Sequence, residues 1–407
     1  MAGIYPFNAI RPRNEIANQV AALPYDVYSR KEAKEYVQGK PLSFLNIDRP
    51  ETAFDDSFDM YSEQAYKSAL SAFEEMKNRG IFFKEEKECY YLYELTMNGR
   101  VQTGIVACAS IDDYINGVIK KHENTREEKE IDRINHVYTM KAQTGPIFLA
   151  YRKNDYLKKM IETVKEDKAE CEFVSEDGIR HRVFKIDATE RIAGIKDAFE
   201  NIENIYIADG HHRAASAVKV GIRMREEGCE GNEYEKFLSI LFSSDELMIM
   251  PYNRVVKDLN GLSKEEFFDA ISEKFDCEEV ETSYMPVSKG TFGLYIENKW
   301  YKLTYNGKVE TNPVKSLDVS ILQDNLLEPI LGIKDPRTDK RIDFIGGIRG
   351  LAELERRAGT DMKIAFSMYP TSLDELFDVS DANMLMPPKS TWFEPKLRSG
   401  LFIHSLE

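Results

Sequence analysis

The spacing of apolar and polar residues along this 407-residue chain alternates between two periods. Short unbroken apolar runs are typical of buried strands, whereas apolar positions roughly three to four residues apart are typical of helices. The buried strands predicted in this way are 146–151, 205–208, 237–242 and 362–368. The predicted helices are 63–79, 125–143, 189–200, 263–275 and 316–328, and the last one is stopped by Pro329.

Turn residues between alternating segments predict hairpins. Segments 90–96 and 101–109 are joined at Asn98-Gly99, the pair that best fits a two-residue hairpin turn. Further hairpins are predicted around 176–178 and over 292–300 and onward. Ser263 with Glu266, and Thr125 with Glu128, have the spacing of capping boxes at helix starts. Proline-rich residues 1–60 predict extended segments and turns.

The mixture of hairpins with strand-to-helix connections predicts an α+β, or mixed α/β, fold. No linker rich in proline, glycine and serine marks a boundary, so three regions are expected from the order of elements. These are an N-terminal α+β region (1–110), a phosphate-binding core (111–255) and a C-terminal α+β region (256–407) that contributes a phosphate loop.

Composition narrows the classes of function. The chain is 42% hydrophobic and 31% charged, which is ordinary for a globular protein, and its formal charge of −15 makes nucleic acid an unfavourable partner. Five scattered cysteines without a CxxC pair favour reduced thiols in a cytoplasmic protein. We read no signal peptide and no run of 18 apolar residues, so a membrane partner is not expected either.

The segment Asp209-Gly210-His211-His212-Arg213 carries the most chemistry. It follows the predicted strand 205–208 and opens a helix, where the first backbone N–H groups have no partners and the helix dipole is positive. Glycine allows a tight turn and a close approach by an anion, and the histidines and arginine add donors. The segment therefore predicts a phosphate cradle at a helix N-terminus. A metal site and a purely structural helix cap are the alternatives, although no further ligands have zinc-type spacing.

His122-Glu123-Asn124-Thr125-Arg126 gathers an acid, a base, a hydroxyl and a cation in one turn. A carboxylate placed there can take the proton of a hydroxyl group that attacks phosphorus. The competing interpretation is that Glu123 and Asn124 only cap the helix that follows. Position 126 is arginine, so the zinc-protease pattern HExxH is excluded.

Lys389-Ser390-Thr391 combines a cation with two hydroxyl groups, which suits phosphate, although the spacing is not that of a Walker loop. Trp392-Phe393 are expected to fill the core. Gly346-Gly347 with Arg349 is expected to be a structural connection from a loop to a helix.

Together these pieces resemble a widespread bacterial family described as a domain of unknown function. The matching pieces are Pro6-Phe7, Arg11-Pro12, Pro24-Tyr25-Asp26-Val27, Ser43-Phe44, His122-Glu123-Asn124-Thr125, Ala208-Asp209-Gly210-His211-His212-Arg213, and Pro387-Pro388-Lys389-Ser390-Thr391 through Pro395-Lys396.

Three of these pieces also resemble the free L-serine kinases of the ParB/sulfiredoxin fold, which implies a ParB/sulfiredoxin-like core with large insertions. The resemblance implies that Glu123 is the general base, that Asp209 binds Mg²⁺ or orients phosphate, and that His211 joins them in the catalytic set. It implies a phosphate site of Gly210, His211, His212, Arg213, Lys389, Ser390 and Thr391. His122, Asn124, Thr125 and Arg126 would then bind the substrate.

The resulting hypothesis is a phosphotransferase acting on a small hydroxyl amino acid, first of all free L-serine or O-phospho-L-serine. Pyrophosphate, ADP or ATP is the expected donor, with Mg²⁺, and a small molecule is the expected partner. A ParB-like nucleotide-binding regulatory or DNA-partitioning protein is one alternative, and a small-molecule phosphatase is another. The sequence leaves the donor, the direction of flux and the oligomeric state open.

Overall fold

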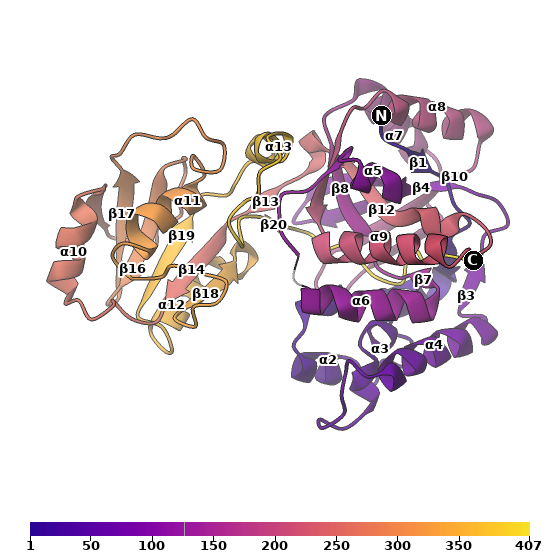
Figure 1. Ribbon diagram of the computed structural model, residues 1–407, viewed down its shortest axis with the longest axis horizontal. Helices are drawn as coiled ribbons and strands as arrows, with labels where there is room; N and C mark the ends of the chain where they lie inside the picture. The colour runs from indigo at the N-terminus through magenta and orange to yellow at the C-terminus, as the bar shows by residue number, and fades with distance from the viewer. Residues whose placement is uncertain (126) are drawn as a thin grey trace. The chain divides into compact units, whose positions relative to one another are not determined.

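The computed structural model describes residues 1–125 and 127–407, and these divide into two compact units. The first unit consists of Met1–Leu247 and Pro395–Glu407, and the second of Met248–Glu394. Both mix helices with strands (Figure 1), so the mixed α/β class predicted from the sequence is confirmed. The boundaries expected at 110 and 255 differ from those of the two units, because strands on both sides of residue 110 share one sheet.

The first unit contains a nine-stranded mixed sheet. Its strands are β1 (Ile4–Tyr5), β4 (Tyr90–Met97), β5 (Arg100–Ser110), β6 (Ile119–Lys120), β8 (Ile147–Tyr151), β9 (Cys171–Val174), β10 (Arg180–Ile186), β11 (Ile205–Asp209) and β12 (Lys236–Ser243). The order is β6-β11-β8-β12-β5-β4-β10-β9, with β1 paired to β5. Two small sheets pair β2 (Ile10–Pro12) with β3 (Phe82–Lys84), and β7 (Ala142–Gln143) with β21 (His404–Ser405).

The first unit contains nine α-helices among the described residues. They are α1 (Ala17–Val20), α2 (Arg30–Tyr36), α3 (Leu45–Asp48), α4 (Glu63–Asn78), α5 (Ile111–Ile115), α6 (Glu127–Met140), α7 (Asp155–Lys165), α8 (Thr189–Glu200) and α9 (His211–Glu226). Helix α9 packs on β8 and β12, and α6 lies between α9 and α4 (Figure 1). Single-turn 3-10 helices lie at Asn14–Ile16, Tyr25–Val27, Pro50–Ala53, Glu233–Glu235 and Ser244–Glu246.

Small side chains allow α9 to lie close to the sheet. Ala214, Ala217 and Val218 belong to the same buried cluster as Leu149 of β8 and Ile207 of β11. Burial of such apolar surface is the main stabilising contribution to this layer. It fixes the start of α9 at the end of β11, where the predicted phosphate cradle lies.

The second unit is built on a six-stranded antiparallel sheet of order β15-β17-β16-β19-β14-β18. The strands are β14 (Tyr252–Val256), β15 (Phe275–Val280), β16 (Thr291–Ile296), β17 (Lys299–Tyr305), β18 (Ile342–Gly346) and β19 (Ile364–Met368). A separate pair joins β13 (Ile249–Met250) to β20 (Trp392–Phe393). The helices are α10 (Lys264–Ser272), α11 (Asp318–Leu322), α12 (Gly350–Ala358) and α13 (Leu373–Asp381), with a 3-10 turn at Gly347–Arg349.

Local signals predicted most of these elements correctly. Asn98 and Gly99 both have positive φ, 51° and 80°, as the predicted hairpin turn between β4 and β5 requires. The Ser263–Glu266 capping box at the start of α10 is present with both hydrogen bonds. The hairpin β16–β17 turns at Glu297 and Asn298, again with positive φ.

Two local predictions are incomplete. Extended segments and turns were predicted for residues 1–60, but this region also contains helices, and Ser29 and Glu32 form a capping box that starts helix α2. The helix predicted over 316–328 is present as α11, but it continues as a π-helical turn, Gln323–Leu327. The capping box predicted for Thr125 and Glu128 lies partly outside the described residues. None of the described helices is both long enough and apolar enough to cross a bilayer.

Candidate active site

Two motifs that are far apart in the sequence meet because β6 and β11 are parallel neighbours. Ile205 pairs with Ile119, and Tyr206 with Lys120. Parallel strands end at the same edge of a sheet, so the segments after Lys120 and after Tyr206 leave it together. His122 and Glu123 therefore lie beside Asp209, Gly210 and His211.

The turn between β11 and α9 has the geometry of an anion site. Gly210 is left-handed, with φ 93° and ψ 31°, and it begins a 16-residue helix that no described side chain caps. The first helical N–H groups are consequently available to a ligand, and the positive end of the helix dipole points the same way. The first turn contains no acidic residue that would occupy this place.

Two cations converge on Asp209 at this turn. Arg213 Nη2 lies 3.6 Å and Lys396 Nζ 3.5 Å from Asp209 Oδ2. Burial by itself would raise the pKa of Asp209, but Lys396, Arg213 and His211 hold it well below its usual range. The carboxylate is therefore ionised at neutral pH and keeps both cations beside the helix start.

Arg213 is held in place from a second side. Its Nη1 donates to the carbonyl oxygen of Pro146 at 2.6 Å, and its side chain is only 12% exposed. A Cβ built on Gly210 would lie 3.0 Å from Arg213 Nε, so the guanidinium rests directly on the glycine. Arg213 faces the cradle and not bulk solvent, as a phosphate site requires.

Glu123 is placed next to the cradle through His211. The backbone N–H of His122 donates to His211 Nε2 at 3.5 Å, so Nδ1 carries the proton of the neutral ring. That nitrogen lies 3.9 Å from Glu123 Oε2. The Glu123 side chain is 43% exposed, whereas that of His211 is 5% exposed. Glu123 can reach a ligand, and His211 is placed to orient it.

His122 is an unusual buried histidine. It is 1% exposed, its ring meets that of His211 edge to face at 4.5 Å, and neither ring nitrogen has a regular hydrogen-bond partner among the described residues. Burial lowers the pKa of His122 to about 4, against the opposing charge of Asp209. Burial and the neighbouring His122 also lower the pKa of His211. Both rings are therefore neutral at pH 7.

This burial predicts acid sensitivity. The pKa of His122 is about 6.5 in the unfolded chain and about 4 in the folded one, so the unfolded state binds more protons as the pH falls between these values. The contribution of His122 to the free energy of unfolding is fully present above pH 6.5. Between pH 6.5 and pH 4 it falls by about 1.4 kcal/mol per pH unit. Urea unfolding of the His122→Asn variant should show a correspondingly shallower pH slope. An identical slope in both proteins would contradict the buried neutral state.

The remaining residues of the two motifs have different surroundings. The Thr125 hydroxyl donates to Glu130 of α6, which also pairs with Lys219 of α9, so the end of the His122–Thr125 segment is fastened to both helices. Asn124 is exposed and His212 is half-buried. Arg126, predicted to bind substrate, lies outside the described residues.

The predicted C-terminal phosphate loop, residues 389–391, belongs to the second unit, whereas the cradle belongs to the first. The Ser390 hydroxyl donates to the Pro387 carbonyl at 2.6 Å, and Arg254 Nη2 donates to the Lys389 carbonyl at 3.1 Å. Lys389 has a positive φ of 60°. The role of Lys389, Ser390 and Thr391 as phosphate donors remains a prediction.

Asp209 was also predicted to bind Mg²⁺. Within residues 1–125 and 127–407, no group of three or more His, Cys, Asp or Glu side chains is arranged to hold a metal ion. Magnesium in phosphoryl-transfer sites needs only one or two carboxylates, because substrate phosphates supply other ligands. The donor set therefore fits an ion bound through phosphate, with Asp209 as a protein ligand, and does not fit one held by the protein alone.

Sequence reasoning missed three parts of this site. Lys396 was noted in a motif but not assigned, and only the fold brings it to Asp209. The roles of the Pro146 carbonyl and of Glu130 could not be predicted. Backbone carbonyl groups and helical glutamates occur throughout any sequence, so these two did not stand out.

Comparison with known proteins places the chain in a family. The profile of a family described as "Protein of unknown function (DUF1015)" matches residues 4–320. The chain belongs to the DUF1015 family. This confirms the family resemblance drawn from the motifs, and the matched segment contains both His122–Thr125 and Asp209–Arg213. No curated protein sequence matches the chain.

Solved structures give distant likenesses. A free serine kinase in complex with AMP is 15% identical, with a TM-score of 0.35, and the match covers 71% of this chain and 86% of that one. SbnI with a C-terminal truncation, from Staphylococcus aureus, is 10% identical, with a TM-score of 0.37 and coverages of 72% and 84%. A conserved hypothetical protein from Pyrococcus furiosus is 15% identical, with a TM-score of 0.33 and coverages of 72% and 91%. At these TM-scores the ParB/sulfiredoxin-like core remains a prediction.

Proposed function

We propose that this DUF1015 protein is a phosphotransferase that moves a phosphoryl group onto the hydroxyl of a small amino acid, with free L-serine as the first candidate. One observation carries the proposal: a reachable carboxylate, Glu123, lies beside a glycine-started helix N-terminus with Arg213 and Lys396 in place. Phosphoryl transfer depends mainly on positioning and charge neutralisation, and this arrangement supplies both.

Each group has a place in the reaction. The acceptor hydroxyl oxygen forms a bond to phosphorus while Glu123 takes its proton, and the bond from phosphorus to the leaving phosphate breaks. Arg213, Lys396 and the N–H groups of α9 bind the phosphate oxygens, whose charge they offset. His211 keeps Glu123 directed at the acceptor. A magnesium ion carried by the donor phosphates, with Asp209 as its protein ligand, would neutralise further charge.

The donor is pyrophosphate, ADP or ATP, and the leaving group is correspondingly inorganic phosphate, AMP or ADP. The cradle binds the phosphate portion that these donors share, so it does not discriminate between them. The same chemistry in reverse consumes O-phospho-L-serine, and the direction depends on the concentrations of the reactants.

The test is a transfer assay on the full chain with L-serine, Mg²⁺ and each donor in turn, followed by ³¹P NMR. We expect phosphoserine to accumulate with at least one donor. Absence of phosphoserine with all three donors would refute the serine kinase proposal. Release of inorganic phosphate from O-phospho-L-serine at the same rate without any acceptor would instead identify a phosphatase.

A further inference from the structure

A large pocket lies in the first unit, beside the cradle but outside it. Its volume is about 600 Å³, within the usual range for small-molecule sites. The 3-10 turn Tyr25–Val27, the end of α3, helix α4 and helix α6 contribute its lining. The residues that carry its chemistry are Tyr25, Asp48, Tyr66, Asp132 and Arg133.

The inner wall of the pocket contains buried charges of both signs. Arg133 is 7% exposed, and its Nε donates to Asp132 Oδ2 at 2.9 Å. The guanidinium carbon lies 4.0 Å from the centre of the Tyr25 ring, a cation–π contact that fixes its plane. Tyr66 donates from its hydroxyl to Asp132 Oδ1 at 3.1 Å. Nη2 of Arg133 also lies 2.8 Å from Asp132 Oδ2, so two nitrogens and the ring contact hold the guanidinium in place. Its Nη1 side is the part that can hold the carboxylate of a ligand.

Asp48 is the second buried charge, only 2% exposed. It accepts a hydrogen bond from Thr144 Oγ1 at 2.8 Å. Burial raises the pKa of Asp48, although Arg133, Thr144 and Ser399 act to lower it. The carboxylate is thus incompletely compensated, and a further positive group beside it would be stabilising.

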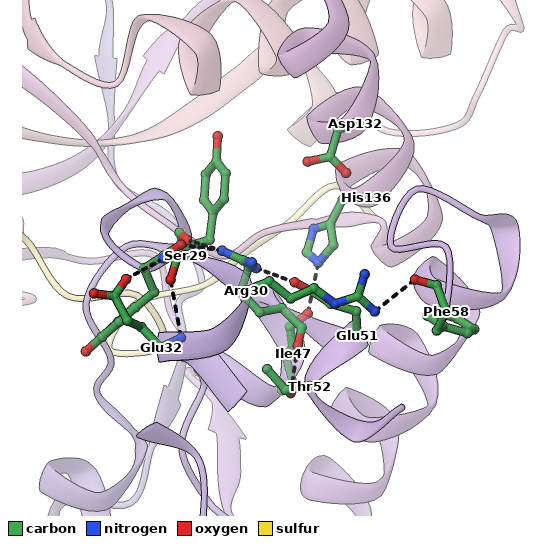
Figure 2. A network of polar contacts seen from close by, with 12 residues as sticks. Ser29, Arg30, Glu32, Ile47, Glu51, Thr52, Phe58, Asp132 and His136 are labelled. Atoms are coloured by element: carbon green, nitrogen blue, oxygen red, sulfur yellow. Dashed lines mark hydrogen bonds and ion pairs between the residues drawn. The ribbon is translucent and has the colours of Figure 1, made fainter. Parts of the chain in front are cut away.

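A network of hydrogen bonds within the pocket wall keeps these groups in position. Arg49 Nη1 donates to the carbonyl oxygens of Tyr25 at 2.9 Å and Tyr28 at 2.7 Å, and its Nε pairs with Glu51. Figure 2 shows His136 of α6 directed at the carbonyl of Ile47, a contact of 3.1 Å. Such second contacts make a preformed site, because the residues that line it cannot relax away from a ligand.

A second, smaller cavity shares lining residues with both the large pocket and the cradle. This cavity of about 30 Å³ is lined by Tyr25, Asp48, Arg133 and His136, which also line the large pocket. The same small cavity is lined by Arg213 of the cradle. The small cavity therefore lies between the large pocket and Arg213, with lining residues in common with the pocket.

The charge of the pocket separates it from the cradle. Its lining includes four carboxylates and three guanidinium groups, the former on Asp26, Asp48, Glu51 and Asp132 and the latter on Arg30, Arg49 and Arg133. A polyphosphate would meet an excess of negative charge here, whereas a molecule with both an ammonium and a carboxylate would find a partner for each.

We infer that this pocket binds the acceptor as an amino-acid zwitterion, with Arg133 holding its carboxylate and Asp48 its ammonium group. The inference rests on the proposed function for the identity of the acceptor. It assigns the phosphate donor and the acceptor to two neighbouring compartments, one positive and one with charges of both signs.

Calorimetric titration of the full chain tests this without any substitution. The probes are L-serine, L-serinamide, which lacks the carboxylate charge, and N-acetyl-L-serine, which lacks the ammonium. We expect each analogue to bind at least about tenfold more weakly than serine, since each loses a charge-assisted hydrogen bond. Equal affinity for all three would overturn the inference.

Two variants assign the residues. Asp48→Asn and Arg133→Lys should each weaken serine binding at least about tenfold. Asp197→Asn, at an exposed aspartate of α8 in the same unit that does not line the pocket, should not change it. Pyrophosphate binding reports on the cradle and should be retained in both pocket variants, which also shows that they are folded. Unchanged serine affinity in the folded variants would overturn the assignment.

The two proposals fail in different ways. Serine binding with the expected dependence on Asp48 and Arg133, but without phosphoserine formation, would support the pocket and refute the phosphotransferase. Phosphoserine formation with undiminished serine affinity in both variants would support the phosphotransferase and refute the assignment of the pocket.

Discussion

A Glu123→Gln variant is expected to form phosphoserine roughly 10²–10⁴ times more slowly than the unmodified protein, which is the usual contribution of a general base. Glutamine keeps the size of the side chain and can still contact His211, but it cannot accept the proton of the attacking hydroxyl. Affinity for pyrophosphate should change little, because Glu123 is not among the groups that bind phosphate. Initial rates and calorimetric titration measure the two effects separately.

Glu127→Gln is the matched control, since Glu127 is an exposed glutamate at the start of α6. Its rate should equal that of the unmodified protein. If Glu123→Gln keeps the full rate of transfer while Glu127→Gln does as well, the base is another group, and the assignment of Glu123 is wrong.

A Gly210→Ala variant is expected to lose phosphate binding by a factor of about ten to a hundred. The new methyl group would lie 3.0 Å from Arg213 Nε and 3.1 Å from its Cζ, so the guanidinium has to shift by a few tenths of an ångström out of its place in the cradle. Because alanine is strained at the positive φ of 93°, the substitution also lowers the free energy of unfolding by about 1–2 kcal/mol. Pyrophosphate titration and urea unfolding measure the two losses.

Gly231→Ala isolates the backbone cost. Gly231 also has a positive φ, 87°, but a Cβ there would meet no described atom within 4 Å. This variant should lose a similar free energy of unfolding and keep its affinity for pyrophosphate. Equal affinity in the two variants would show that Arg213 does not depend on the space above Gly210.

Local sequence signals predicted the parts of the site but not their assembly. The strand-to-helix turn at Gly210 was predictable because an apolar run, a glycine and an alanine-rich helix follow one another directly. The adjacency of Glu123 was not, because β6 is only two residues long and pairs with a strand more than 80 positions later. Pairing over such separations depends on the whole sheet and leaves no periodic trace in a two-residue strand.

The acceptor pocket shows the same limit in another form. Tyr25 was part of a motif in the sequence. Nothing in the sequence distinguished Asp48 and Arg133 from other charged residues, because only the fold shows that they are buried. Asp132 and Arg133 fall in the predicted helix 125–143, whose sequence does not show which of its many charges are buried. In the structure α6 lies between α4 and α9, so charges on this helix become part of a buried wall.

The return of residues 395–407 to the first unit has a consequence for biosynthesis. A nascent chain that has emerged only as far as Leu247 carries Asp209 and Arg213 but lacks Lys396. It also lacks Ile403, which pairs with Ile10, and His404, which pairs with Gln143. Translation of the entire intervening unit must finish before these contacts can form, so Lys396 can join Asp209 only after the second unit has been synthesised.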